Sequence, residues 1–359
     1  MTRRPLSLFD ATMPEWGAWV DDKPGLAFAD SCLRGVGQVI FLNNPVTGLL
    51  ILVAHLVASP RLVASAAVGV VASTATAQLL GFDRSRIRAG YYGYNGLLAG
   101  AALAVFLVPS WKPTYVCSVI LLALSTTILM AALSEILAVF ELPSLTLSFN
   151  LVTIPFLWST YALPGIEHGP LLSIHAIGGV IDPTLRMGPE TASLAAGSAI
   201  VQFVLRGIGQ LFLVDGAVSG LLILLGILCS SRVAAIVAVA GSLAGGAVGV
   251  ALGASGTAIV HGLWGFNAYV TFVALSGVYF VLDARSALLG LAGAVAATIV
   301  YAGFSGAFGP WGVPALTLPF CLVTLVLLLL QRSTALFRPT PLGRITTPED
   351  HLRLFRSQR

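Results

Sequence analysis

One stretch of the sequence occurs twice. Residues 34–53 read RGVGQVIFLNNPVTGLLILV, and residues 206–225 read RGIGQLFLVDGAVSGLLILL, with each shared residue 172 positions further on. Two more blocks repeat in the same order: GYN at 93–95 returns as GFN at 265–267, and PSLTL at 143–147 returns as PALTL at 314–318. Three blocks in one order at nearly one spacing predict that the chain contains two copies of one structural unit.

The chain is too apolar for a water-soluble domain. Of its 359 residues, 57% are hydrophobic and 9% are charged, and the mean hydropathy is +0.92, whereas soluble domains carry roughly 25% charged residues. Apolar runs at 62–80, 115–140 and 233–252 approach the roughly 20 residues of a membrane-spanning helix. They lack the alternation of barrel strands, and lipid admits only helices or closed barrels. The predicted fold class is an all-α polytopic membrane protein.

Equivalent loops of the two copies differ in charge. Residues 81–90, GFDRSRIRAG, contain three arginines, whereas residues 253–262, GASGTAIVHG, contain no lysine or arginine. Because cytoplasmic loops are enriched in lysine and arginine, we expect the two loops on opposite sides of the membrane. The arginine-rich tail is then cytoplasmic. The predicted arrangement is two inverted five-helix repeats with broken half-helices and ten transmembrane spans, in the cell (inner) membrane, with both termini cytoplasmic.

These patterns divide the chain into five segments. Residues 1–31 form an N-terminal cytoplasmic or interfacial segment, and residues 32–164 form the first transmembrane repeat. A linker at 165–203 carries three acidic residues and one arginine, as expected on the extracellular side. Residues 204–331 form the second transmembrane repeat, and residues 332–359 form a cytoplasmic tail.

The polar residues that recur in both copies carry no charge. Each copy supplies an amide, an aromatic ring after a glycine, and a hydroxyl. These residues are Gln38 and Gln210, Tyr94 and Phe266, and Thr146 and Thr317. A passage lined by such groups offers hydrogen bonds without fixed charge. It suits a small neutral polar solute and gives an ion little compensation for its lost hydration.

Each of these groups also has a structural explanation. A membrane glutamine can join two helices, a threonine can bond a carbonyl of its own helix, and the rings can be packing residues. Recurrence inside longer matched blocks favours the pore. Asn95 and Asn267 are expected to fix the local backbone turn. Arg34 and Arg206 are expected to anchor the chain at the membrane interface, with lipid phosphate as a candidate partner.

Other functions fit the sequence less well. A proton- or ion-coupled transporter of a small neutral solute needs a titratable group on the pathway, and the only candidate, Glu135, has no acidic counterpart near Gly306. An ammonia channel would carry paired histidines, but His261 corresponds to Ala89. The five histidines and four cysteines show no catalytic or metal-ligand spacing. The sequence therefore predicts no enzyme, no cofactor and no metal, and its net charge of +4, placed at the ends and in short loops, predicts no nucleic-acid partner.

The three blocks resemble those of the urea transporter family, over nearly the whole of both repeats. The markers are GVGQVIFLNNPVTG at 35–48, GYNGLLAG at 93–100 with its GFN echo, and the PxLTLxF stretches that end at Phe149 and Phe320. The resemblance implies a passive channel selective for urea, with small amides as further candidates. It also implies a homotrimer within membrane lipid, with one pore through each protomer.

The resemblance further implies roles for individual residues. Gln38 and Gln210 would stand at the ends of a selectivity filter, and Thr146 and Thr317 at its narrow middle. The walls of flat slots would be formed by Phe41, Tyr94, Leu98, Leu213, Phe266 and Val270. Two of these residues depart from the family pattern. Tyr94 stands where phenylalanine is usual, so one slot is expected to gain a hydroxyl, and Leu213 removes a ring from the other.

Overall fold

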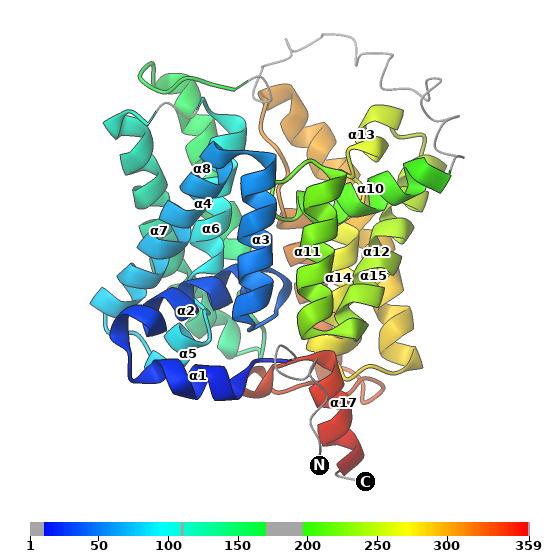
Figure 1. The fold of residues 1–359 in the computed structure, drawn as a ribbon. Helices are drawn as coiled ribbons and strands as arrows, with labels where there is room; N and C mark the ends of the chain where they lie inside the picture. Colours follow the sequence, from blue (N-terminus) through cyan, green and yellow to red (C-terminus); the bar gives the residue numbers. More distant parts are fainter. Residues whose placement is uncertain (1–10, 109–110, 170–196, 358–359) are drawn as a thin grey trace.

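The computed structural model describes residues 11–108, 111–169 and 197–357. In these ranges the regular elements are all helices (Figure 1), which confirms the prediction of an all-α fold. The first ten residues and most of the predicted linker, residues 170–196, lie outside the described part of the chain.

Proline begins most helices of the first half. The helices are α1 (Pro14–Asp21), α2 (Pro24–Gly37), α3 (Pro45–Ala58), α4 (Pro60–Leu79), α5 (Arg84–Arg88), α6 (Tyr94–Phe106), α7 (Pro113–Ala138) and α8 (Leu147–Ser159). Proline suits the first helical position because the N–H it lacks has no partner there. Before α3, the Asn44 side chain also accepts hydrogen bonds from the backbone N–H groups of Val46 and Thr47, which fixes where this helix begins.

The second half repeats these elements. Its helices are α10 (Gly197–Gln210), α11 (Ala217–Ser230), α12 (Arg232–Ala251), α13 (Gly256–Val260), α14 (Phe266–Val273), α15 (Ala284–Phe308) and α16 (Leu318–Leu328), and α17 (Pro348–Ser357) follows. The bounds of α11, α12 and α13 lie 172 residues after those of α3, α4 and α5. Left-handed backbone recurs as well: φ is 64° at Phe41 and 60° at Leu213. The two stretches therefore share local structure as well as sequence.

In the described part of the chain, helices α2 and α14 each end in a break of the helical backbone. After α2, a short turn at Gln38–Ile40 precedes Phe41, and the chain then bends by 80° into α3. After α14, the turn Ala274–Val278 contains Gly277 with φ at 148°, a conformation that only glycine adopts readily. Such breaks free backbone groups that a regular helix would have used.

Helices α3 and α11 join the two halves. They lie side by side in the middle of the molecule (Figure 1), and the Thr47 hydroxyl on α3 donates a 2.7 Å hydrogen bond to the Gly226 carbonyl on α11. Within each half, a Cβ at Gly48 would collide with the Leu33 carbonyl, and one at Gly220 with the Leu205 carbonyl. Glycine at these positions permits the close helix contacts that are typical of membrane proteins.

Equivalent elements lie at opposite ends of the molecule. Figure 1 shows α2 and α5 toward one end, and their counterparts α10 and α13 toward the other. The first end also carries α1 and α17, the helices nearest the two termini in the described part of the chain.

Four of the described helices are long and apolar enough to cross a membrane: α4, α7, α12, and α15 with its extension to Trp311. The bent pair α2–α3 makes a fifth candidate, and further apolar helices of 10 to 17 residues include α6, α11, α14 and α16. These lengths agree with a membrane protein that contains several apolar helices.

Candidate functional site

The threonines of the two PxLTL blocks meet. The hydroxyl oxygens of Thr146 and Thr317 are 2.7 Å apart, and both residues are buried. Thr146 directly precedes α8 and Thr317 directly precedes α16, so the contact joins helix ends from different halves. Before each threonine stands a leucine with left-handed backbone, Leu145 with φ at 49° and Leu316 with φ at 48°. This shared turn directs each threonine toward its counterpart.

The buried Asn150 makes three hydrogen bonds to the two threonines. The Asn150 amide nitrogen donates to the Thr146 carbonyl at 2.8 Å and to the Thr317 hydroxyl at 3.0 Å, and its oxygen accepts from the Thr317 N–H at 3.1 Å. The equivalent residue in the second half is Cys321, whose sulfur lies 3.2 Å from the Thr146 hydroxyl. The sequence interpretation missed Asn150 because its counterpart is a different residue type, so the repeat gave no signal.

The two glutamines are held in the same way. The Gln38 amide nitrogen donates to the Ala89 carbonyl at 2.9 Å, and the Gln210 amide nitrogen donates to the His261 carbonyl at 2.8 Å. Both side chains are half-buried. The nitrogen of each amide is thereby oriented, and its oxygen, an acceptor with two lone pairs, is directed away from that bond.

At both ends that carry a glutamine, an arginine lies near an aspartate, but the two pairs differ in geometry. At the first, the buried Arg34 donates to Asp30 at 2.7 Å and to the Thr12 carbonyl at 2.7 Å. The expectation that Arg34 binds lipid phosphate is therefore wrong, because its charge is already paired inside the protein. At the second, Asp215 lies 2.5 Å from His261 and 3.8 Å from Arg206.

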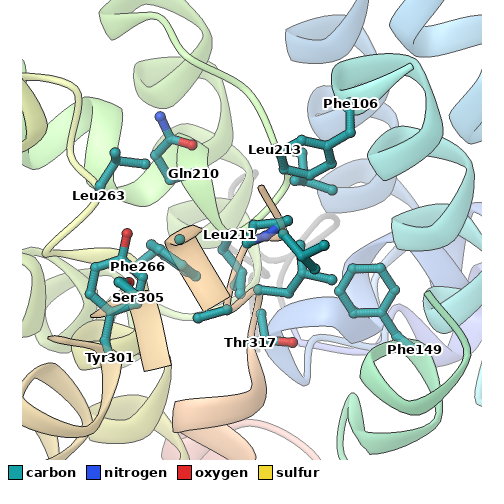
Figure 2. A pocket seen from close by; sticks show the side chains of 15 residues that line it. Phe106, Phe149, Gln210, Leu211, Leu213, Leu263, Phe266, Tyr301, Ser305 and Thr317 are labelled. Atoms are coloured by element: carbon teal, nitrogen blue, oxygen red, sulfur yellow. The ribbon is translucent and has the colours of Figure 1, made fainter. Parts of the chain in front are cut away.

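A cavity of about 200 Å³ lies on the Gln210 side of the threonine contact. Figure 2 shows Gln210 near one end of it and Thr317 toward the other, with rings of Phe266, Tyr301 and Phe149 around the space. The remaining lining residues are Phe106, Leu211, Leu213, Leu263, Ser305, Gly309, Val313, Pro314, Ala315 and Leu316. None of the lining side chains is ionisable at neutral pH, so the cavity is an apolar space with a few amide, hydroxyl and phenol groups.

The cavity brings together four of the predicted site residues: Gln210, Leu213, Phe266 and Thr317. Thr146 adjoins it through its bond to Thr317. Gln38, Phe41, Tyr94, Leu98 and Val270 do not line it. Leu98 and Val270 are fully buried, and the Phe41 ring packs at 5.4 Å, edge to face, against the Tyr279 ring.

Tyr94 differs from expectation. Its hydroxyl donates a 2.6 Å hydrogen bond to the Leu145 carbonyl. The predicted slot beside Tyr94 therefore does not gain a free hydrogen-bond donor, because the hydroxyl is already bonded to the backbone carbonyl just before Thr146.

Several cavity residues were missed from the sequence. Phe149 had a signal, since it ends the first PxLTLxF block. Phe106, Tyr301 and Ser305 stand in ordinary apolar helices, and only the packing of α6 and α15 brings them to the cavity.

Apolar helices around an uncharged cavity, with matched amides and hydroxyls from two similar halves, define a membrane transport protein. The chain belongs to the urea transporter family, because the family model described as urea transporter matches residues 29–332. Urea transporter 1 of the goat Capra hircus is 34% identical over 353 residues, which cover 97% of this chain and 89% of the goat protein. Urea transporter 1 of the mouse Mus musculus is 34% identical over 348 residues, or 94% of this chain and 86% of the mouse protein. The prediction of a transporter of this family, and not an enzyme, is confirmed.

Proposed function

We propose that the chain is a passive channel for urea, with small amides as further candidate solutes. The meeting of Thr146 and Thr317 beside an uncharged cavity carries this proposal. It supports a pathway to which the two halves contribute equivalent groups, with the threonines at its narrow middle.

Urea fits the chemistry of these residues. It is flat, with N–H donors in its plane, one carbonyl acceptor and two faces that make few hydrogen bonds. Aromatic rings pack well against flat partners, while amide, hydroxyl and backbone oxygens can accept from the N–H groups. Each lost and unreplaced hydrogen bond would cost roughly 1–3 kcal/mol, so acceptors along the path lower the barrier.

We assign the predicted residues accordingly. Gln38 and Gln210 stand at the two ends of the filter. Phe41, Tyr94 and Leu98 form the wall in one half, and Leu213, Phe266 and Val270 form it in the other. Support is stronger for the second half, where three of these residues and Thr317 share one cavity, than for the first, whose assigned residues do not line that cavity.

Coupling to an ion gradient has little support. The residues around the cavity include no Asp, Glu, Lys, Arg or His. Glu135, the candidate from the sequence, is exposed on α7 and is not among them. A coupled carrier would need such a group on the pathway.

Reconstituted vesicles test the proposal. We expect proteoliposomes that contain the protein to re-swell faster than empty liposomes after an inward urea gradient is imposed, as followed by light scattering. The rate should be the same with and without a proton or sodium gradient. A requirement for either gradient would support the coupled transporter, and no acceleration would exclude urea conduction.

We further propose ten crossings in two inverted halves, a homotrimer surrounded by membrane lipid, and both termini on the cytoplasmic side of the cell (inner) membrane. A helix of 13 residues spans about 20 Å, less than the roughly 30 Å hydrocarbon core, so α6 and α8 would cross only part of the membrane. The shared end of α1, α17 and the arginine-rich α5 supports the orientation through the positive-inside rule. Native mass spectrometry of the detergent-solubilised protein tests the trimer.

A further inference from the structure

The two halves hold the same strained turn by different side chains. In the second half, the Asn267 nitrogen donates to the Leu316 carbonyl at 3.1 Å, and its oxygen accepts from the Phe320 N–H at 3.1 Å. In the first half, the Leu145 carbonyl is bound by the Tyr94 hydroxyl at 2.6 Å instead. Phe266, the counterpart of Tyr94, has no hydroxyl with which to do this.

Asn95, the counterpart of Asn267, is left without this task. Its nitrogen lies 3.2 Å from the sulfur of Met130, a weak acceptor. Its oxygen is buried and has no hydrogen-bond partner among the described residues. A buried amide oxygen without a partner is rare in folded proteins, so the side chain is displaced from the role that its counterpart performs.

The turn itself needs an anchor. Leu145 and Leu316 both have left-handed backbone, with φ at 49° and 48°, which a branched side chain adopts only at a cost. Such conformations persist where surrounding contacts hold them in place. The anchored carbonyl belongs to the peptide group that leads directly into Thr146 or Thr317, so the anchor sets the position of the threonine.

We propose that Tyr94 and Asn267 are positioning residues for the two central threonines, and that Asn95 does not take part. This inference rests on the proposed channel, in which the threonines form the narrow middle. Asn95 and Asn267 occupy equivalent places in the two repeats, but only Asn267 is predicted to position a threonine.

The matched substitutions Asn267→Leu and Asn95→Leu test this separation in the vesicle assay. Asn267→Leu should slow urea flux about tenfold or more, the factor that accompanies the loss of a buried hydrogen bond. Asn95→Leu should leave the flux within about twofold of the wild type, because Tyr94, and not this amide, binds the Leu145 carbonyl. Equal losses in the two variants would overturn the inference.

A transplant of the hydroxyl provides the second test. Phe266→Tyr places a hydroxyl where Tyr94 has one, so it should restore urea flux to the Asn267→Leu variant. In the first half, Tyr94→Phe should make Asn95 important, so that Tyr94→Phe combined with Asn95→Leu is slower than Tyr94→Phe alone. Failure of either effect would overturn the inference.

Thermal unfolding of the same variants separates this inference from the proposed function. If the wild-type protein conducts urea and the variants do not follow the stated order, the positioning role fails and the channel stands. If the wild type conducts no urea, the channel fails, and the unfolding midpoints then decide the positioning role. Asn267→Leu should lower the midpoint, Phe266→Tyr should restore it, and Asn95→Leu should leave it nearly unchanged. Any other order would reject the inference.

Discussion

Thr146 and Thr317 carry the two hydroxyl groups that we propose for the narrow middle of the channel. We predict that Thr146→Val and Thr317→Val each slow urea flux about tenfold, because valine keeps the shape and removes one hydrogen-bonding group. Thr298→Val on α15 is the matched control, since that buried hydroxyl bonds the Ala294 carbonyl of its own helix. Light scattering of proteoliposomes measures the rates. Normal rates in both variants would remove the threonines from the filter.

The glutamines provide a second prediction for single residues. Gln38→Phe and Gln210→Phe should each lower urea flux more than about tenfold, because the ring fills the end of the passage and the amide is lost. Assembly should be unchanged, as judged by the elution volume in gel filtration. Gln78→Phe, at an exposed position near the end of α4, controls for added bulk. If flux survived in both filter variants, the amides would only join helices.

Residues that recur in both halves could be identified from the sequence, and residues that differ between them could not. Gln210, Phe266 and Thr317 were predicted and share one cavity. Asn150 bonds the Thr317 hydroxyl, and its counterpart Cys321 contacts the Thr146 hydroxyl. Because the two side chains differ, the repeat did not identify them as site residues. The engaged hydroxyl of Tyr94 was also beyond the sequence, because its acceptor lies 51 residues away in another turn.

The C-terminal helix α17 is fastened to α12. Glu349 accepts from the Val233 N–H at 2.9 Å and from the Ser231 hydroxyl at 2.7 Å, at the end of α12 where N–H groups lack helical partners. His351 in the same helix bonds the Gly277 carbonyl at the break after α14, at 2.8 Å. The tail therefore covers two helix ends of the second half.

This attachment yields a prediction for stability. Glu349→Ala should lower the free energy of unfolding by about 1 kcal/mol, the usual cost of losing a helix cap. Arg353→Ala is the control, because its exposed ion pair with Asp350 should contribute little. Thermal unfolding in detergent measures both changes. A Glu349→Ala midpoint equal to that of the wild type would show that the tail adds nothing to α12.

The sequence predicted the helices of the apolar runs well, because length and hydrophobicity decide them. It said little about the tail, since α17 is short and its bonds are made to residues more than 70 positions away.

For the whole molecule, the inverted arrangement can be tested by labelling. In a variant without native cysteines, Ser85→Cys in α5 and Thr257→Cys in α13 introduce thiols at equivalent, exposed positions. If the halves are inverted, a membrane-impermeant maleimide added to intact cells should modify the cysteine at position 257 and not that at 85. Permeabilised cells should show both modified. Labelling of both sites from outside would contradict the inversion.

The sequence by itself determined the membrane class, the two similar halves, the family and the identity of the recurring polar residues. These follow from local composition and from repetition, which need no knowledge of packing. The tertiary structure alone decided that Thr146 contacts Thr317, that Tyr94 and Asn267 hold equivalent turns by different bonds, and that Arg34 is paired inside the protein. Each of these depends on hydrogen bonds between residues brought together by folding, and the choice of partner at a buried polar group is set by geometry that no spacing along the chain encodes.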